Sequence, residues 1–306
     1  MITVLCGGVG AARLLKVLSG ATDPANLIGI VNTGDDLTLH GLKICPDLDT
    51  ITYTLAGLNN EETGWGLAGE TWRVMAELGE LGGANWFSLG DRDLATHLYR
   101  TQRLAEGAGL AEITAELGER LGCAVRLLPV TEDPLATVLE TPDFGTLSFQ
   151  EYFVGHHHSV PVSAVRVQGA ESARPTPGVL EAIAEAERIV IAPSNPLISL
   201  GPLLSVPGIV DALEARRADV LAISPLIGGQ ALKGPADRLM EELGHGATAS
   251  GVAALYRPIA STLLIDEVDA LERAAVEAAG MDCLVGPTLL SDPKGAAHVA
   301  AVVLGV

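Results

Sequence analysis

Four aspartates gather in one segment, residues 31–54, which begins as an apolar run ends. They are Asp35, Asp36, Asp47 and Asp49. Clustered carboxylates beside glycine and proline can hold a hard divalent cation, because Mg²⁺ takes oxygen ligands and is usually bound by one or two carboxylates plus substrate phosphates. The alternative is a solvated turn, since aspartate often ends a strand in an acidic protein. The cluster predicts a magnesium site with these four aspartates as candidate ligands.

A glycine-rich turn at residues 7–10, GGVG, follows a short apolar run. Glycines in such a turn let the backbone approach a pyrophosphate closely. The turn is not a dinucleotide fingerprint, because Arg13 replaces the third glycine, and it is not a P-loop, because no Gly-Lys-Ser/Thr follows. Arg13 can pair bidentately with phosphate oxygens. The pattern favours a nucleoside diphosphate over NAD, with an unliganded turn between strand and helix as the alternative.

The net charge of −19 argues against nucleic acid and against anionic membranes as partners. Only four lysines occur in the 306 residues, so backbone N–H groups, helix N-termini and a bound cation would have to balance a phosphorylated ligand. Four widely spaced cysteines without a Cys-x-x-Cys pair indicate a reduced, cytoplasmic protein. Neither a membrane span nor a signal peptide is indicated.

Four apolar runs must position the glycine turn and the aspartates, and they lie at residues 2–6, 27–31, 189–192 and 220–223. We expect them to be adjacent strands of one sheet. Loops at the carboxyl ends of parallel strands bind ligands in open α/β folds. Ser194 and Asn195 follow the third run, and Asn195 offers both a donor and acceptors to a nucleobase edge or ribose.

The middle of the chain has short β-rich runs at close spacing, unlike the alternating strands and helices around it. The sequence therefore predicts an α/β fold with a doubly wound, mainly parallel Rossmann-like sheet. Residues 1–103 and 178–306 are expected to form the core, and residues 104–177 an inserted β-containing subdomain that covers the cleft. Three consecutive histidines at 156–158 are read as a solvated turn rather than a metal site.

Arg92 lies between two aspartates at a Gly-Asp turn that opens a helix. It is either part of a structural ion pair or a contact to an anionic or planar substrate. On that helix we expect Leu94, Leu98 and Tyr99 to share one side. Lys233 lies near the start of a later helix, after another glycine turn.

Several long blocks occur in an order that resembles the 2-phospho-L-lactate transferase family of coenzyme F420 biosynthesis. They are GGVGAARLL, VNTGDDLTLHGLKICPDLDTITYTLAG, WFSLGDRDLATHLYRT, APSNPLISLGPLL and SPLIGGQALKGPADRLM. The resemblance implies a Mg²⁺-dependent homodimeric enzyme that moves a phospholactyl-type group from a guanosine diphosphate adduct to the ribityl hydroxyl of the deazaflavin FO. GMP would leave, and the product would be F420-0 or its dehydro form.

The same resemblance implies roles for individual residues. Asp49 and Arg92 match positions expected to contact FO. Asp49 is also a candidate to accept the hydroxyl proton, although metal binding competes for its carboxylate, and Asp36 is a second candidate catalytic carboxylate. Gly8, Gly10 and Arg13 would bind the diphosphate. Ser194 and Asn195 would contact the guanosine. The donor carboxylate would be bound by one of Lys43, Gln230 and Lys233. Whether the donor carries lactate, enolpyruvate or glycerate stays open.

Two other classes compete with the transferase. The gluconeogenesis-factor family, a nucleotide-sugar-binding regulator rather than an enzyme, has a Gly-Gly-Ser after its paired aspartates where this chain has GDDLTLHG. That difference and the CPDLDT block favour the transferase. An NAD-dependent reductase is disfavoured by Arg13 and by Asn32 at the end of the second apolar run.

Overall fold

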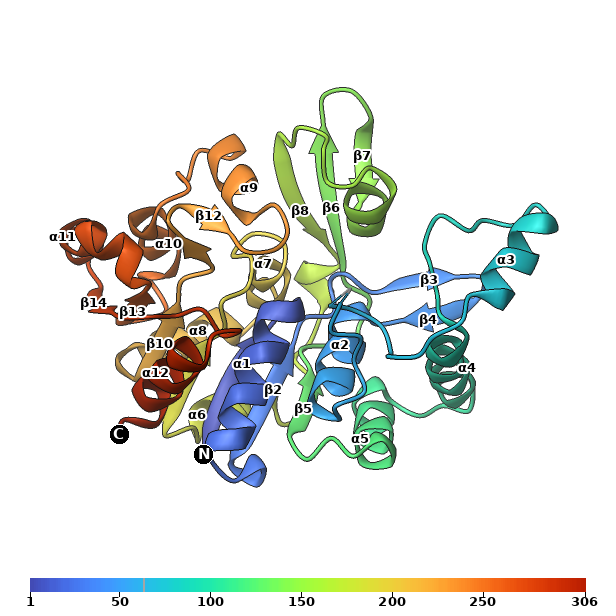
Figure 1. Cartoon of the computed structure of the whole chain (residues 1–306), viewed down its shortest axis with the longest axis horizontal. Coiled ribbons are helices and arrows are strands. Elements are labelled where there is room, and N and C mark those ends of the chain that lie inside the picture. Colours follow the sequence, from blue (N-terminus) through green and yellow to red (C-terminus); the bar gives the residue numbers. More distant parts are fainter. Residues whose placement is uncertain (63) are drawn as a thin grey trace.

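A seven-stranded parallel sheet forms the centre of the molecule in this computed structural model, which describes residues 1–62 and 64–306 (Figure 1). Numbered along the chain, its strands lie in the order 3-2-1-4-5-6-7, as in doubly wound folds. The predicted fold class and the adjacency of the four apolar runs are therefore confirmed. From edge to edge the strands are β14 (Asp282–Val285), β13 (Thr262–Ile265), β10 (Val220–Ile223), β9 (Arg188–Ile191), β1 (Ile2–Cys6), β2 (Leu27–Val31) and β5 (Arg126–Pro129).

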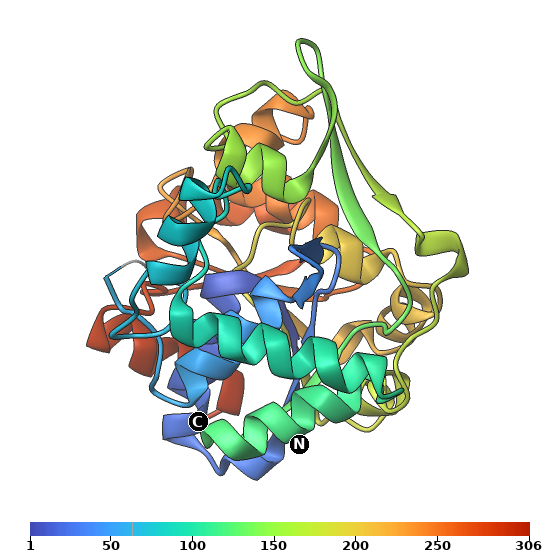
Figure 2. The same cartoon turned by 90° about the vertical axis from the view of Figure 1, so that its right-hand side faces the viewer.

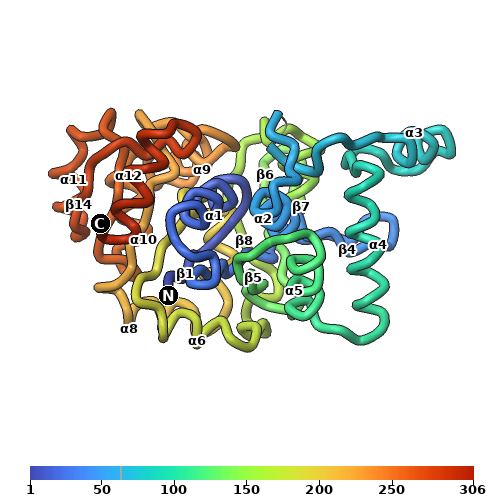
Figure 3. The backbone as a smooth tube through the Cα atoms, turned by 60° about the horizontal axis from the view of Figure 1, so that its bottom comes forward, coloured from blue at the N-terminus to red at the C-terminus, as the bar shows by residue number. Residues whose placement is uncertain are grey.

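Helices cover both faces of this sheet, because successive side chains of a strand point to opposite faces. In β1, Leu5 packs into one hydrophobic core, whereas Val4 and Cys6 pack into the other. Figure 3 shows α1 and α12 on one side and α6 and α8 on the other. One layer contains α1 (Gly8–Ala21), α2 (Pro46–Leu55), α5 (Leu110–Leu121) and α12 (Pro293–Leu304); the other contains α6 (Val179–Ala184), α7 (Leu200–Leu204), α8 (Ile209–Ala215), α9 (Ala236–Glu242), α10 (Ala249–Tyr256) and α11 (Arg273–Ala278).

A separate three-stranded antiparallel sheet projects from the main body (Figures 1 and 2). It contains β6 (Ala136–Thr141), β7 (Gly145–Ser148) and β8 (Ala164–Gln168). Helix α5 and strand β5 also fall within residues 104–177, but β5 pairs with β2 in the central sheet. The separate β-structure therefore begins at β6 rather than at residue 104. The division of the chain into domains at 104 and 177 stays a prediction.

A second projection carries a hairpin and two helices (Figures 1 and 2). The hairpin pairs β3 (Leu37–Leu39) with β4 (Leu42–Ile44), and the helices are α3 (Arg73–Glu80) and α4 (Asp91–Ala105). Leu94, Leu98 and Tyr99 do not form one buried side of α4, because Leu98 is 58% exposed while His97 and Arg100 are buried. A short hairpin of β11 (Leu226–Ile227) and β12 (Gln230–Ala231) completes the strands. Within the described ranges, no helix has the length and apolar character needed to cross a membrane.

Candidate functional site

A cavity of about 620 Å³ opens at the carboxyl ends of β1 and β9, where the strand order reverses. Ligands of open α/β sheets bind at this position. The expected convergence of the glycine turn, the aspartate segment and the loop after β9 is found here. The predicted residues that line the cavity are Gly8, Gly10, Arg13, Asp35, Asp47, Asp49, Ser194, Asn195 and Lys233. Asp36 and Arg92 are not among the described lining residues.

The glycine turn brings the N-terminus of α1 to the cavity wall. Gly8 has a φ of +65°, which favours glycine, and a Cβ on Gly10 would overlap the carbonyl oxygen of Pro193. The hydroxyl of Ser194 donates to the Gly7 carbonyl over 2.6 Å and ties the loop after β9 to this turn. The first N–H groups of α1 have no partner within the helix, so they form a potential anion-binding site.

Two cationic side chains, Arg13 and Lys233, line the cavity near this helix start. Partial burial, and then the neighbouring charge of Arg13, lower the pKa of Lys233. Among the described residues neither side chain forms an ion pair with a carboxylate. Two unneutralised like charges beside a helix N-terminus form an electrostatic environment that suits a phosphorylated ligand.

Asn195 also lines the cavity. Its Oδ1 accepts the backbone N–H of Leu197 over 2.9 Å, which fixes the amide orientation. Its Nδ2 is buried and has no hydrogen-bond partner in the described part of the chain. A buried donor without a partner costs free energy unless a ligand or water satisfies it, so this amide is suited to contact a ligand acceptor.

Asp35 and Asp47 form a buried acidic pair at the cavity. Thr137 donates to Asp35 and Asn32 to Asp47, each over 3.1 Å. Burial, and then the charge of Asp47, raise the pKa of Asp35, while burial raises the pKa of Asp47 to about 7. Among the described residues no lysine or arginine pairs with either carboxylate. This oxygen-rich pair therefore fits a divalent cation.

Asp36 occupies a different environment from its neighbour Asp35. Its Oδ2 accepts from Lys43 Nζ over 3.0 Å and from Cys45 Sγ over 3.1 Å. Burial raises the pKa of Asp36, and the Lys43 charge opposes this shift. Because a lysine already balances this carboxylate outside the cavity lining, the geometry does not support its predicted metal or catalytic role, which stays a prediction.

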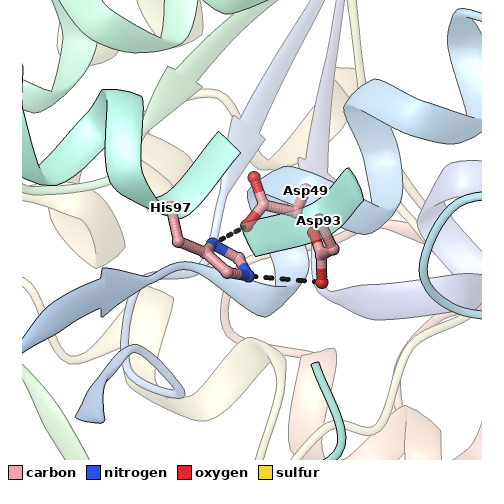
Figure 4. Close-up of side chains that lie close together, drawn as sticks. All are labelled: Asp49, Asp93 and His97. Carbon is pink, nitrogen blue, oxygen red and sulfur yellow. Dashed lines mark ion pairs between the residues drawn. The ribbon is translucent and has the colours of Figure 1, made fainter. Parts of the chain in front are cut away.

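Asp49 joins a cluster with Asp93 and His97, whose ligand atoms all lie within 4.8 Å of one another (Figure 4). His97 Nδ1 lies 3.7 Å from Asp49 Oδ2, and His97 Nε2 lies 3.2 Å from Asp93 Oδ2. Such a cluster is compatible with a divalent cation. However, Arg100 donates to both oxygens of Asp49, with 3.1 Å between Nη1 and Oδ2. A buried guanidinium already balances this carboxylate.

Arg92 is exposed at the start of α4. Its guanidinium donates to the carbonyl oxygen of Ala68, and its backbone N–H donates to Glu70 over 2.8 Å. The flanking aspartates bind other groups: Asp91 accepts from Thr71, and Asp93 from Tyr53. The predicted contact between Arg92 and FO therefore has no support in the cavity lining and stays a prediction.

Sequence reasoning missed two sets of residues in or beside the cavity. Asp93, His97 and Arg100 are spaced i, i+4 and i+7, and this spacing places them on one helical face. A polar stripe of that kind was a detectable signal. Aromatic side chains from separate segments also line the cavity, and no local pattern links them. They are Tyr53, Trp65, Phe87, Phe149 and Phe153.

Comparisons with known proteins identify the family of this chain. A family model described as 2-phospho-L-lactate transferase CofD matches residues 2–282. The chain is 47% identical to a phosphoenolpyruvate transferase of Kitasatospora aureofaciens, covering 100% of this chain and 97% of the relative. It is 44% identical to the protein of that name from Streptomyces coelicolor, covering 98% and 95%. A crystal structure of a UPF0052 family member from Bacillus halodurans shares the fold, with a TM-score of 0.68, 18% identity and coverage of 99% and 98%.

Proposed function

Because the chain belongs to the 2-phospho-L-lactate transferase family, we propose that it transfers an enolpyruvyl phosphate or 2-phospholactyl group from a guanosine diphosphate adduct to the ribityl hydroxyl of FO. The products are GMP and dehydro-F420-0 or F420-0. The observation that carries this proposal is the make-up of the cavity lining, which combines two cations and a helix N-terminus with aromatic rings and carboxylates.

The cationic groups of the cavity suit the donor. The N–H groups at the start of α1, together with Arg13, bind the diphosphate. Asn195 meets the guanosine through its unpartnered Nδ2. Lys233 is the better candidate for the donor carboxylate, because Lys43 is paired with Asp36 and Gln230 is outside the described lining.

The aromatic groups of the cavity suit the acceptor. Aromatic side chains such as Trp65 and Phe149 offer faces and edges to a planar deazaflavin ring. Asp49 lines the cavity and accepts the hydrogen bond of the ribityl hydroxyl. The hydroxyl oxygen attacks the phosphorus of the transferred group and its proton passes to Asp49. The P–O bond to GMP breaks, and GMP leaves with the electron pair. Holding the two substrates in line supplies much of the acceleration.

Asp35 and Asp47 are the best candidates to hold Mg²⁺. They are buried oxygen ligands with raised pKa values and no cationic partner among the described residues, whereas Asp49 is already paired with Arg100. When bound, Mg²⁺ would neutralise charge on the diphosphate. A chain of net charge −19 needs that neutralisation to accept an anionic donor.

The test is a discontinuous assay with purified protein, FO, MgCl₂ and either the enolpyruvyl or the phospholactyl guanosine diphosphate donor. We expect equimolar GMP and a phosphodiester product of FO by chromatography and mass spectrometry. Binding of GDP without turnover of either donor would instead indicate a regulator of the gluconeogenesis-factor type. Light scattering of the same preparation tests the predicted homodimer.

A further inference from the structure

Arg100 is the largest of the fully buried side chains, and it lies on α4 opposite α2. Its guanidinium donates to both oxygens of Asp49 and contacts the Lys43 carbonyl over 3.3 Å. Arginine forms such a two-point contact in one plane, so it fixes the orientation of the carboxylate as well as its position. Each carboxylate oxygen has two lone-pair sites, and the contact uses one of each. Since no other hydrogen bond reaches this carboxylate from the described residues, the remaining sites can accept from a ligand in the cavity that Asp49 lines.

A second layer of contacts fixes the guanidinium itself. Arg100 Nη1 lies 3.2 Å from His97 Nδ1. Because a guanidinium only donates, this nitrogen must be the acceptor, and the imidazole proton is on Nε2. Nε2 lies 3.2 Å from Asp93 Oδ2, although it makes no aligned hydrogen bond there. Asp93 in turn accepts from Tyr53 over 2.7 Å. The order Tyr53, Asp93, His97, Arg100, Asp49 connects two helices through polar contacts.

We propose that Arg100 is a positioning residue of the transfer reaction, which holds the Asp49 carboxylate in the orientation that receives the acceptor hydroxyl. This inference rests on the proposed function. It gives the cluster of Asp49, Asp93 and His97 a role other than metal binding, because the guanidinium supplies the positive charge that a metal ion would otherwise bring.

Two other roles for Arg100 make different predictions. If Arg100 only stabilises the fold, its replacement weakens the binding of both substrates in parallel with a loss of stability. If the cluster binds metal, removing Arg100 frees Asp49 as a ligand and lowers the Mg²⁺ concentration needed for half-maximal rate. The positioning role predicts a change in FO binding or kcat, with GDP binding and Mg²⁺ dependence unchanged.

The experiment compares Arg100→Lys and Arg100→Met with Arg103→Lys. Arg103 lies on the same helix and pairs with Glu106, Glu112 and Glu116 outside the cavity lining, so it is a matched control. The measurements are FO affinity by quenching of FO fluorescence, GDP affinity by calorimetry, kcat, Mg²⁺ dependence and the melting temperature. Turnover of FO by the unmodified protein tests the proposed function separately.

We expect Arg100→Lys to lose at least tenfold in kcat/KM for FO while GDP affinity changes less than twofold, and Arg100→Met to lose more. Combining Arg100→Lys with Asp49→Asn should add little to the loss caused by Asp49→Asn alone, because both changes act through one carboxylate. This double-mutant cycle tests the positioning role even if Arg100→Met does not fold. The inference would be overturned if the losses in kcat/KM of the two single variants were additive, or if FO and GDP affinity fell in parallel. It would also be overturned by a lowered Mg²⁺ requirement, or by an FO affinity and kcat equal to those of the control.

Discussion

Replacing Asp47 by asparagine removes one charge from the acidic pair at the cavity while keeping an oxygen that can accept from Asn32. In the metal-free protein, burial raises the pKa of Asp47 from 3.8 to about 7. The native state therefore holds this proton more tightly than the unfolded chain does. The stability contributed by the proton is fully present below the unfolded pKa and is lost as the pH rises through the folded pKa.

The size of this effect follows from the two pKa values. At about 1.4 kcal/mol per pKa unit, the difference between 3.8 and about 7 corresponds to about 4 kcal/mol. About 3 kcal/mol of this falls between pH 5 and pH 8. Asparagine does not titrate. In the absence of metal, the free energy of unfolding of Asp47→Asn should therefore rise relative to the unmodified protein by about 3 kcal/mol over that range, and then stay constant.

Urea unfolding at pH 5, 6.5 and 8 with a chelator measures this difference. A difference that is independent of pH would show that Asp47 is not a buried carboxylate of raised pKa. Adding Mg²⁺ at pH 8 should stabilise the unmodified protein more than Asp47→Asn, because the cation binds the ionised pair. Asp36→Asn is the control, since Asp36 is paired with Lys43, and its response to Mg²⁺ should match that of the unmodified protein.

Three further substitutions test other parts of the site. Gly10→Ala should lower the free energy of unfolding by about 1–3 kcal/mol, because the added Cβ overlaps a backbone carbonyl. Gly20→Ala in the same helix has open space around it and should raise the free energy of unfolding by up to about 1 kcal/mol. Equal changes for the two variants in urea unfolding would contradict this. Lys233→Gln should raise the KM for the guanosine diphosphate donor roughly tenfold through loss of a charge-assisted hydrogen bond, with the KM for FO unchanged. If steady-state kinetics instead show a raised KM for FO and an unchanged KM for the donor, Lys233 contacts the acceptor. Arg92→Lys should lower the melting temperature by about 2–4 °C through loss of a backbone contact, and an FO affinity that falls tenfold instead would restore the predicted FO contact.

The parts of the fold that the sequence predicts correctly are those where local pattern and tertiary structure agree. The apolar runs at residues 2–6 and 27–31 are buried on both faces, so a continuous run of apolar residues is a sufficient signal. The glycine turn is also visible in the sequence, because Gly8 has a φ of +65° and the close approach of Gly10 to Pro193 admits no side chain. Their convergence at one cavity then follows from the parallel topology.

Helix α4 shows why the rest of the site could not be predicted in this way. We expected Leu94, Leu98 and Tyr99 to share one side of this helix, and of these three only Leu94 is buried. The inner face instead carries His97 and Arg100, which are buried because Asp49 on another helix balances their polarity. Burial of a charged group depends on a partner, and Asp49 is 51 positions away from Arg100 in the chain. Periodicity reports only the polarity of the segment itself.

In the aspartate segment, too, the role of each carboxylate depends on a partner that the local sequence does not show. Four carboxylates of identical chemistry divide into three groups according to the cation that each meets. Lys43 balances Asp36, and Arg100 balances Asp49, whereas Asp35 and Asp47 meet no cation among the described residues. Two buried carboxylates with raised pKa values are stable as a charged pair only if a cation arrives from outside the chain. The same pair lines the cavity into which Arg13 and Lys233 project, so the binding of that cation and of an anionic donor should be mutually dependent.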